Sequence, residues 1–273
     1  MLPYDLYHPV LFYLLLSLQI NHLDMFLGKI DISNETTVTD IVIKDYRTAT
    51  VFRRYGIDYC CGGKLPLGMV CDIRGLDVEV IKQELIAALR TIQVSSSTDF
   101  ANWSTRFLLD YMVNVHHAYL RMHFPDIIET TRSFVEGHKK KYDYLPDLFE
   151  ALQALEEELM KQMEEEEAVL FPYISQIAQA HLQDEPYGSL FVRTMRKPVA
   201  NLINHGETVA RCLHVLRDLT HSYQPAPNAC ITHRVCMAKL KELDHELMQH
   251  VYLETNIIYP RVVAMEAAIT AAD

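Results

Sequence analysis

The chain has 273 residues, of which 49% are hydrophobic and 22% are charged, with only 9 glycines and 11 prolines. This length and composition are typical of a globular protein with a full hydrophobic core, so they exclude a disordered chain and a small disulfide-stapled scaffold. The formal net charge of −11 opposes binding to a phosphate backbone, and nucleic acid is therefore not an expected partner.

Residues 1–37 are predicted to form an apolar N-terminal extension that packs on the body of the protein. Its apolar run, Val10 to Leu18, is too short to cross the ~30 Å hydrocarbon core of a bilayer. No Lys or Arg precedes this run, as a secretory signal would require. We therefore expect no membrane anchor.

Residues 38–94 are predicted to form a small helical domain. Thr39 is placed to cap a first short helix, Gly56 to end a second, and Asp77 to cap a third over residues 78–90, since these residue types favour helix ends. The segment lacks the alternation of apolar and polar residues that is typical of strands.

Residues 99–268 are predicted to form an antiparallel four-helix bundle, which makes the fold all-α. Apolar residues recur there at helical spacing, as at Leu148, Leu152 and Leu155, and the loops between the amphipathic stretches are short. The four stretches lie at about residues 99–124, 146–180, 189–222 and 229–268.

One short pattern occurs twice within the predicted bundle, at an offset of 88 residues. The two copies are Gln162-x3-Glu166-x4-Phe171-Pro172 and His250-x3-Glu254-x4-Tyr259-Pro260. His117 and His205 share the offset, and each lies 49 residues before the glutamate of its copy. A bundle made of two copies of a helical hairpin would bring these positions together around a pseudo-twofold axis.

The repeat predicts a metal site in the core of the bundle. Residues four apart lie on one face of a helix, so each copy can direct two side chains inward. Facing carboxylates in a core repel each other unless a cation lies between them. Glutamates and histidines that point inward from four helices are the means by which bundles hold paired iron or manganese ions.

Most of the 13 histidines are expected to be structural or at the surface, and the Glu-rich run at residues 164–167 would ordinarily be a solvated face. Among these four glutamates, the repeat identifies only Glu166 as a candidate ligand instead of a solvated residue. His116 and His245 lie beside proposed ligands but have no counterpart at the repeat offset, so we expect them to support the ligands without binding metal.

These residues, together with the segment from Tyr55 to Lys64, which contains Cys-Cys-Gly-Gly, and the segment from Leu76 to Ile81, resemble the iron-sulfur cluster repair di-iron proteins. This family is also called the repair of iron centres family, and the resemblance covers about Val38 to Met265. It implies a small helical domain joined to a hemerythrin-like bundle, and a cytoplasmic role in restoring iron-sulfur clusters damaged by nitric oxide or oxidants. Damaged iron-sulfur proteins are the implied partners, while the oligomeric state stays open and includes a homodimer.

The resemblance also implies two non-haem iron ions held by four histidines and two bridging glutamates. The residues that match are His117, His205, His250, Glu166 and Glu254. Gln162 occupies the remaining histidine position, and its amide oxygen is a weaker donor toward iron than imidazole. One iron is then loosely held, bound through water, or captured by a carboxylate such as Glu158 or Glu165.

Cys60 and Cys61 are the candidate residues for iron handling or thiol redox exchange. Adjacent cysteines do not readily form a disulfide with each other, and the nearby basic residues Arg53, Arg54 and Lys64 favour thiolate. The alternative is that both are buried small residues at a Gly-rich turn. The other four cysteines, which are expected in the core of a protein from a reducing compartment, are Cys71, Cys212, Cys230 and Cys236.

Three functions fit these features. The leading interpretation is a repair factor, partly an enzyme and partly an iron donor. The second is a hemerythrin-like module that binds or senses dioxygen or nitric oxide, but such a module has no use for a Cys-Cys-Gly-Gly domain. The third is a metal-free interaction module, which would leave costly unpaired carboxylates in the core.

Overall fold

The computed structural model describes residues 32–60, 63–89, 99–183 and 188–271, so most of the predicted N-terminal extension lies outside the described residues. All regular elements of the described chain are helices, apart from one isolated bridge between Thr37 and Pro66. The predicted all-α fold is therefore confirmed. Among the described helices, none has the length and apolar character needed to cross a membrane.

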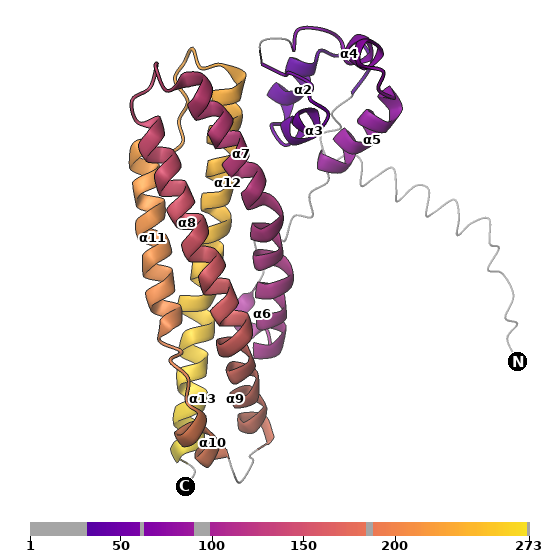
Figure 1. Cartoon of the computed structure of the whole chain (residues 1–273). Helices are drawn as coiled ribbons and strands as arrows, with labels where there is room; N and C mark the ends of the chain where they lie inside the picture. Colours follow the sequence, from indigo (N-terminus) through magenta and orange to yellow (C-terminus); the bar gives the residue numbers. More distant parts are fainter. Residues whose placement is uncertain (1–31, 61–62, 90–98, 184–187, 272–273) are drawn as a thin grey trace, which may run out of the picture.

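The N-terminal domain consists of four short helices (Figure 1). Thr37 caps the first of them, because its hydroxyl accepts a hydrogen bond from the Asp40 N–H at 3.1 Å. Thr39, which the sequence suggested for this role, instead donates its hydroxyl to the Tyr59 carbonyl. The helices are α2 (Val38–Lys44), α3 (Thr48–Arg54), α4 (Leu67–Arg74) and α5 (Val78–Leu89).

Two other predicted helix ends occur as expected. Gly56 follows α3 with a φ of 64°, a left-handed conformation that favours glycine. The Asp77 carboxylate accepts a hydrogen bond from the Glu79 N–H at 2.8 Å at the start of α5. Gly63 is required for a different reason, because a Cβ there would clash with Thr39 and with the Tyr59 carbonyl.

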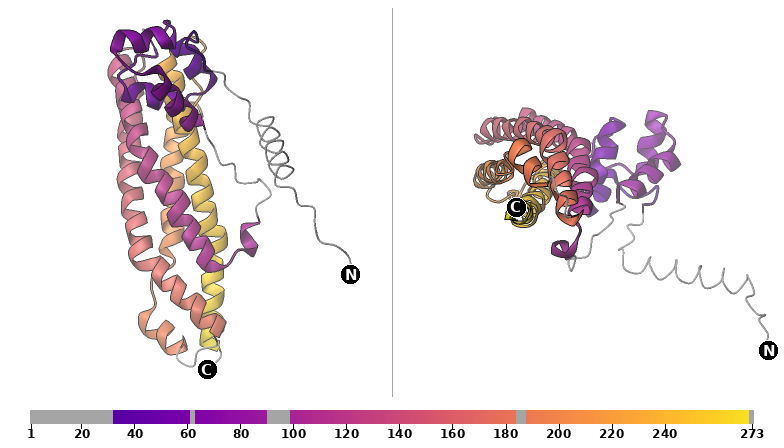
Figure 2. Two further views of the ribbon diagram at one scale, coloured as in Figure 1. Left: turned by 90° about the vertical axis from the view of Figure 1, so that its right-hand side faces the viewer. Right: turned by 90° about the horizontal axis from the view of Figure 1, so that it is seen from below.

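A long four-helix bundle forms the rest of the described chain (Figures 1 and 2). Three of its four long helices contain a π-helical segment in the middle, and a short 3-10 turn, η1 (Phe100–Asn102), precedes the first. The first two long helices are α6 (Thr105–Tyr111), η2 (Met112–His117) and α7 (Ala118–His138), then α8 (Leu145–Glu165), η3 (Glu166–Leu170) and α9 (Phe171–Gln183). The others are α11 (Asn201–Leu219), then α12 (Ile231–Leu253), η4 (Glu254–Ile258) and α13 (Tyr259–Ala271), with the short α10 (Gly188–Met195) beside α9 and α13.

Two prolines explain where the bundle departs from the predicted stretches. The first helix continues through Pro125 to His138, because Pro125 lies on an exposed face where water can bond the carbonyl that lacks a partner. The third stretch is broken between Met195 and Asn201. Pro198 lies in this break, and proline also disfavours helix at the residue before it.

A polar layer divides the core of the bundle into two apolar clusters. The cluster nearer the small domain includes Leu120, Leu159, Leu213 and Leu247. The cluster nearer the C-terminus includes Met112, Leu170, Leu202 and Leu253. On each of the four long helices the polar layer lies between these two clusters, so apolar side chains exclude water from both of its ends.

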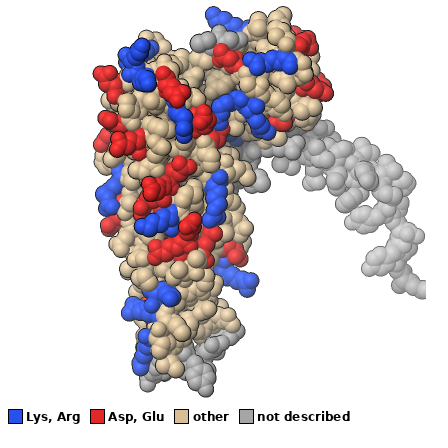
Figure 3. All heavy atoms as spheres, viewed as in Figure 1, with Lys and Arg blue, Asp and Glu red and all other residues tan. Residues whose placement is uncertain are grey.

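The surface of the bundle carries charges of both signs side by side, as the face in Figure 3 shows. Arg132 and Glu129, for example, lie 3.5 Å apart with about half of each side chain exposed. Exposed pairs of this kind typically contribute ~0–1 kcal/mol to stability. The buried charged groups are therefore the better candidates for a functional role.

The small domain packs against α7 and α12 near one end of the bundle (Figure 2). Val235 of α12 belongs to the apolar core of the small domain. Beside it, Asp126 of α7 forms ion pairs with both Arg53 of α3 and Lys239 of α12, and Lys239 also donates to the Thr50 hydroxyl at 2.7 Å. Two cations thus share one carboxylate at the junction. These ion pairs fix the position of the small domain on the bundle.

Candidate metal centre

The three π-helical segments lie at the level of the polar layer. η3 begins at Glu166 and η4 begins at Glu254, so these segments repeat the offset of the sequence pattern. η2 ends at His117. A π turn inserts a residue into a helix and is frequent at functional sites. In the first helix it accompanies two adjacent inward side chains, since His116 and His117 are both buried.

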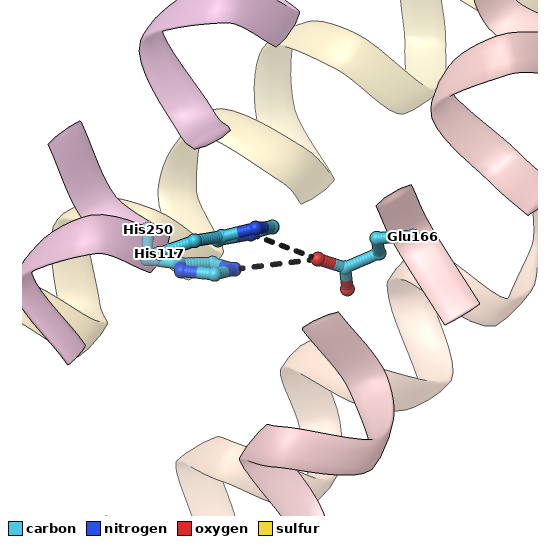
Figure 4. Close-up of side chains that lie close together, drawn as sticks. All are labelled: His117, Glu166 and His250. Carbon is cyan, nitrogen blue, oxygen red and sulfur yellow. Dashed lines mark ion pairs between the residues drawn. The ribbon is translucent and has the colours of Figure 1, made fainter. Parts of the chain in front are cut away.

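His117, Glu166 and His250 converge on one point from three helices (Figure 4). The Nε2 atoms of His117 and His250 lie 3.2 Å and 4.0 Å from the same oxygen, Oε2 of Glu166. The two imidazole rings stack with their centroids 5.3 Å apart. His117 Nε2 and Glu166 Oε2 are buried without an aligned hydrogen-bond partner, so both atoms are free to bind a ligand.

Glu254 completes a pair of buried carboxyl groups with Glu166. Its Oε1 lies 2.9 Å from His250 Nε2, the atom that also lies 4.0 Å from Glu166 Oε2. Burial and the nearby charge of Glu166 raise the pKa of Glu254 well above its usual range. Burial opposes ionisation of Glu166 as well, but the neighbouring His117 imidazole and the hydrogen bond with His205 outweigh it and lower the pKa of Glu166 to about 2. One carboxyl group therefore holds a proton unless a cation takes its place.

His205 approaches this pair from α11. Its Nδ1 lies 3.2 Å from Glu166 Oε1, and its side chain is 12% exposed. The next residue, Gly206, lets α11 come close to η4, since a Cβ there would lie 2.8 Å from Thr255 Cγ2. His205 therefore reaches the centre from the opposite side to His117.

The donor set fits a divalent transition-metal ion. Imidazole nitrogens and carboxylate oxygens are common ligands of iron and manganese, and the ligand atoms offered by His117, Glu166 and His250 all lie within 4.8 Å of one another. A cation would also compensate the two buried carboxylates. Of the six ligands expected from the sequence, five are therefore directed toward one another in the polar layer.

Gln162, the sixth, is buried at 4% exposure but turns its amide toward another side chain. Its Nε2 donates to Glu158 Oε1 at 3.1 Å. Glu165, the other carboxylate considered as a substitute ligand, lies with its Oε2 3.5 Å from His205 Nε2. Glu158 thus pairs with the Gln162 amide, and Glu165 contacts the ring nitrogen of His205 that faces away from Glu166.

Two outer glutamates were not recognised in the sequence. Glu167 accepts from His117 Nδ1 at 2.6 Å and pairs with Arg121 at 2.8 Å, and Glu246 contacts His116 Nδ1 at 2.6 Å. A carboxylate on the second nitrogen of a histidine fixes the ring and makes the first nitrogen a stronger metal donor. Glu167 lies within the Glu-rich run and Glu246 one turn before His250, and the sequence offers no other signal for either role.

The two histidines expected to support the ligands occupy different environments. The ring of His116 lies edge-on to that of His250, with centroids 5.8 Å apart. His245 is exposed and lines a cleft of about 780 Å³ between α2 and α12. Only His116 is therefore placed to influence the centre.

Cys60 lies in the small domain, half-buried, with its backbone N–H donating to Asp58 Oδ1 at 2.7 Å; Cys61 lies outside the described residues. Two of the three basic residues expected to favour a thiolate have carboxylate partners, since Arg53 pairs with Asp126 and Arg54 with Glu84. The domain junction at Asp126 is nine residues from His117, or roughly 14 Å along a helix. Cys60 is accordingly not part of the centre in the bundle.

The other cysteines divide into two groups. Cys71 and Cys236 are buried in the core, as expected. Cys212 and Cys230 are only half-buried, and the sulfur of Cys230 lies 3.3 Å from His138 Nε2. Cys212 still packs against the core of the bundle, so the expectation that all four belong to the core is wrong for Cys230.

Comparison with known proteins gives matches on both sides of the domain junction. Residues 34–89 match the family model of ScdA_N, described as a domain of unknown function, and residues 108–262 match that of the hemerythrin HHE cation binding domain. The chain is 30% identical over 220 residues to the iron-sulfur cluster repair protein YtfE of Escherichia coli O157:H7, covering 81% of this chain and 93% of the relative. YtfE of Shigella boydii serotype 4 is 29% identical over the same shares.

Proposed function

Because this chain belongs to the family of the iron-sulfur cluster repair proteins, with a ScdA_N domain followed by a hemerythrin domain, we propose that it binds two iron ions in its bundle and supplies iron to damaged clusters. The clients are iron-sulfur proteins injured by oxidative or nitrosative stress. The iron ion that is transferred to the client is a substrate of the repair reaction. The site of action is the cytoplasm, where cysteine thiols stay reduced.

The observation that carries this proposal is the approach of two buried carboxyl groups, those of Glu166 and Glu254, to His250 Nε2 in a layer closed by apolar clusters on both sides. Both carboxyl groups are 1% exposed. Two such groups are costly in a dry core unless cations compensate them. When bound, iron supplies an exchangeable Lewis-acidic cation, and the two glutamates are the residues suited to bridge a pair of ions.

The remaining residues have separate tasks. When iron is bound, His117 and His250 would hold one position from η2 and α12, and His205 would hold the other from α11. Glu167 keeps the His117 ring in the orientation that directs Nε2 inward, since it occupies Nδ1 at 2.6 Å. Cys60 and Cys61 receive iron or exchange thiols on the small domain, which the shared Asp126 ion pairs hold on the bundle.

Recovery of a damaged client tests this function. An iron-sulfur enzyme inactivated by nitric oxide is mixed anaerobically with the iron-loaded protein, with the metal-free protein, or with free ferrous iron at equal concentration. We expect faster recovery of client activity with the iron-loaded protein than with either control. Reversible spectral changes with dioxygen or nitric oxide, without client recovery, would instead assign the bundle to gas binding.

A further inference from the structure

Cys230 lies outside the metal centre and forms a pair with a histidine at the far end of α7. It is the N-terminal cap residue of α12, but its sulfur caps no backbone N–H of that helix. The sulfur lies instead 3.3 Å from Nε2 of His138, the last residue of α7. Both residues are half-buried, so the pair is packed on the bundle and still accessible from the surface.

The hydrogen bonds of His138 determine which of its ring nitrogens carries a proton. Its Nδ1 lies 3.1 Å from the Phe134 carbonyl, and a carbonyl only accepts, so Nδ1 is the donor. In the neutral ring Nε2 is then an acceptor, and the Cys230 thiol donates its proton to this atom. A nucleophile within hydrogen-bond reach of a base, with a third group that orients the base, is the arrangement that activates a nucleophile.

A second histidine nearby, His233, is not suited to act as the base. Its side chain is 3% exposed, and its ring stacks on that of Phe134 with centroids 4.6 Å apart. Burial, together with the neighbouring His138, Lys141 and Arg234, lowers the pKa of His233 to about 4. His233 therefore stays uncharged at neutral pH, and His138 is the base of the pair.

The surroundings of the Cys230 sulfur favour negative charge. Cys230 lies at the N-terminus of α12, a helix of 23 residues, where the helix dipole places a partial positive charge. The loop at residues 139–144 follows His138 directly and contains three exposed lysines against a single acidic residue, Asp143. Arg234 is exposed as well. This positive charge stabilises an attacking thiolate and attracts an anionic reactant.

Cys212 provides the contrast within the same bundle. Like Cys230 it is half-buried, but it lies in the interior of α11 and not at a helix end. Burial raises the pKa of the Cys212 thiol. The two cysteines are thus matched in burial and differ in their chemical surroundings.

We propose that Cys230 is a site of thiol–disulfide exchange, with His138 as its base, and that its reactant is a low-molecular-weight disulfide that carries carboxylates, such as oxidised glutathione. His138 Nε2 takes the thiol proton, and the Cys230 sulfur attacks one sulfur of the disulfide. That S–S bond breaks as the new one forms, and the leaving thiolate takes the proton from His138. The Cys230 sulfur is oxidised and the leaving sulfur is reduced, so the reaction needs no other oxidant.

The mixed disulfide would form beside the domain junction. Ile231, the next residue after Cys230, packs against the apolar core of the small domain. The exchange involves no residue of the metal centre, so this inference does not depend on bound iron. It adds a second reactive site to the chain, at the opposite end of α7 from His117.

Modification of individual cysteines in the full chain tests this assignment. The reduced protein is mixed at neutral pH with oxidised glutathione or with the uncharged hydroxyethyl disulfide, and the modification of each cysteine is followed with time by peptide mass spectrometry. The variants are His138→Gln, Lys141→Gln and, as a matched control, His214→Gln, which alters an exposed histidine of α11. Circular dichroism verifies the fold of each protein.

We expect Cys230 to form the mixed disulfide with glutathione at least about tenfold faster than Cys212, because a positioned base typically accelerates a reaction by about 100-fold or more. His138→Gln should slow the reaction of Cys230 at least about tenfold with either disulfide. Lys141→Gln should slow it roughly twofold with oxidised glutathione only, and His214→Gln should change neither rate.

Equal rates at Cys230 and Cys212 would overturn the inference, and so would an unchanged rate at Cys230 in a folded His138→Gln variant. If Lys141→Gln slows both disulfides equally, or neither, the assignment of an anionic reactant is wrong. A Cys230 that stays reduced in a protein that binds iron and repairs a client would overturn this inference and leave the proposed function standing. If His138→Gln does not fold, the ratio of the two rates in the unaltered protein decides the matter.

Discussion

The buried carboxyl groups of Glu166 and Glu254 approach the same atom, Nε2 of His250, at 4.0 Å and 2.9 Å in the layer between the two apolar clusters. Each is 1% exposed, and the two come from helices whose π segments begin at these glutamates. Two adjacent carboxylates cannot both ionise in a dry core without a compensating cation. This pair therefore links the stability of the bundle to its metal content.

Removal of metal should lower the melting temperature of the protein. Iron at 100 times its dissociation constant stabilises a folded protein by about 2.7 kcal/mol if it does not bind the unfolded chain. For a chain of this size that corresponds to a Tm change of roughly 5–10 °C. Thermal unfolding with ferrous iron and with a chelator measures the difference, and equal Tm values would argue against a metal in the core.

Glu167→Gln should weaken iron binding without removing a ligand. The change leaves His117 in place but replaces the carboxylate at its Nδ1 with a neutral amide, and changes of this type typically cost 10–100-fold in metal affinity. Competition with a chelator measures the affinity, and Glu164→Gln serves as the control. An unchanged affinity would show that Glu167 only pairs with Arg121 at the surface.

Replacement of Cys60 and Cys61 by serine should separate repair from metal binding. The small domain lies roughly 14 Å along the bundle from the centre, so helical content and iron loading should stay nearly the same while client repair falls. The measurements are circular dichroism, iron per chain and recovery of client activity. A double variant that unfolds, yet repairs normally per folded molecule, would mean that the cysteines serve the fold.

Asp126→Asn should loosen the contact between the domains. The change leaves Arg53 and Lys239 without their shared carboxylate, and Lys239 is only 6% exposed. Loss of one partner from a buried ion pair costs about 3 kcal/mol, and we expect a loss of about 2 kcal/mol here because Arg53 is partly exposed. Urea unfolding measures the loss in free energy of unfolding, and Glu129→Gln, on the same helix, is the control. A change above ~0.5 kcal/mol in the free energy of unfolding of this control would contradict the account.

The sequence predicted the fold and the inner ligands because both depend on periodic patterns. Helical spacing located the bundle, and the 88-residue offset paired His117 with His205 and Glu166 with Glu254. The offset also showed that Gln162 stands where the other copy has His250. It could not show the outer partners of the histidines, Glu167 at His117 and Glu165 at His205, which look like solvated residues until the helices are packed.

Local backbone features also lay beyond the sequence patterns. A regular helix would place adjacent residues on different faces, so the burial of both His116 and His117 depends on η2, for which no sequence rule was available. The predicted first stretch ended at residue 124, just before Pro125, whereas the helix continues to His138 because Pro125 lies on an exposed face. Lys239 would be taken for a surface residue, whereas tertiary packing places it under the small domain.

Iron per chain in anaerobically purified protein, compared with the same measurement on Glu254→Ala, tests the central claim most directly. Loss of the Glu254 carboxylate would remove a bridge and leave excess positive charge in a dry layer, so metal binding should weaken sharply. We predict two irons per chain in the unaltered protein and a steep fall in the variant. Full iron occupancy in Glu254→Ala, or an unaltered protein that binds no iron, would contradict the account.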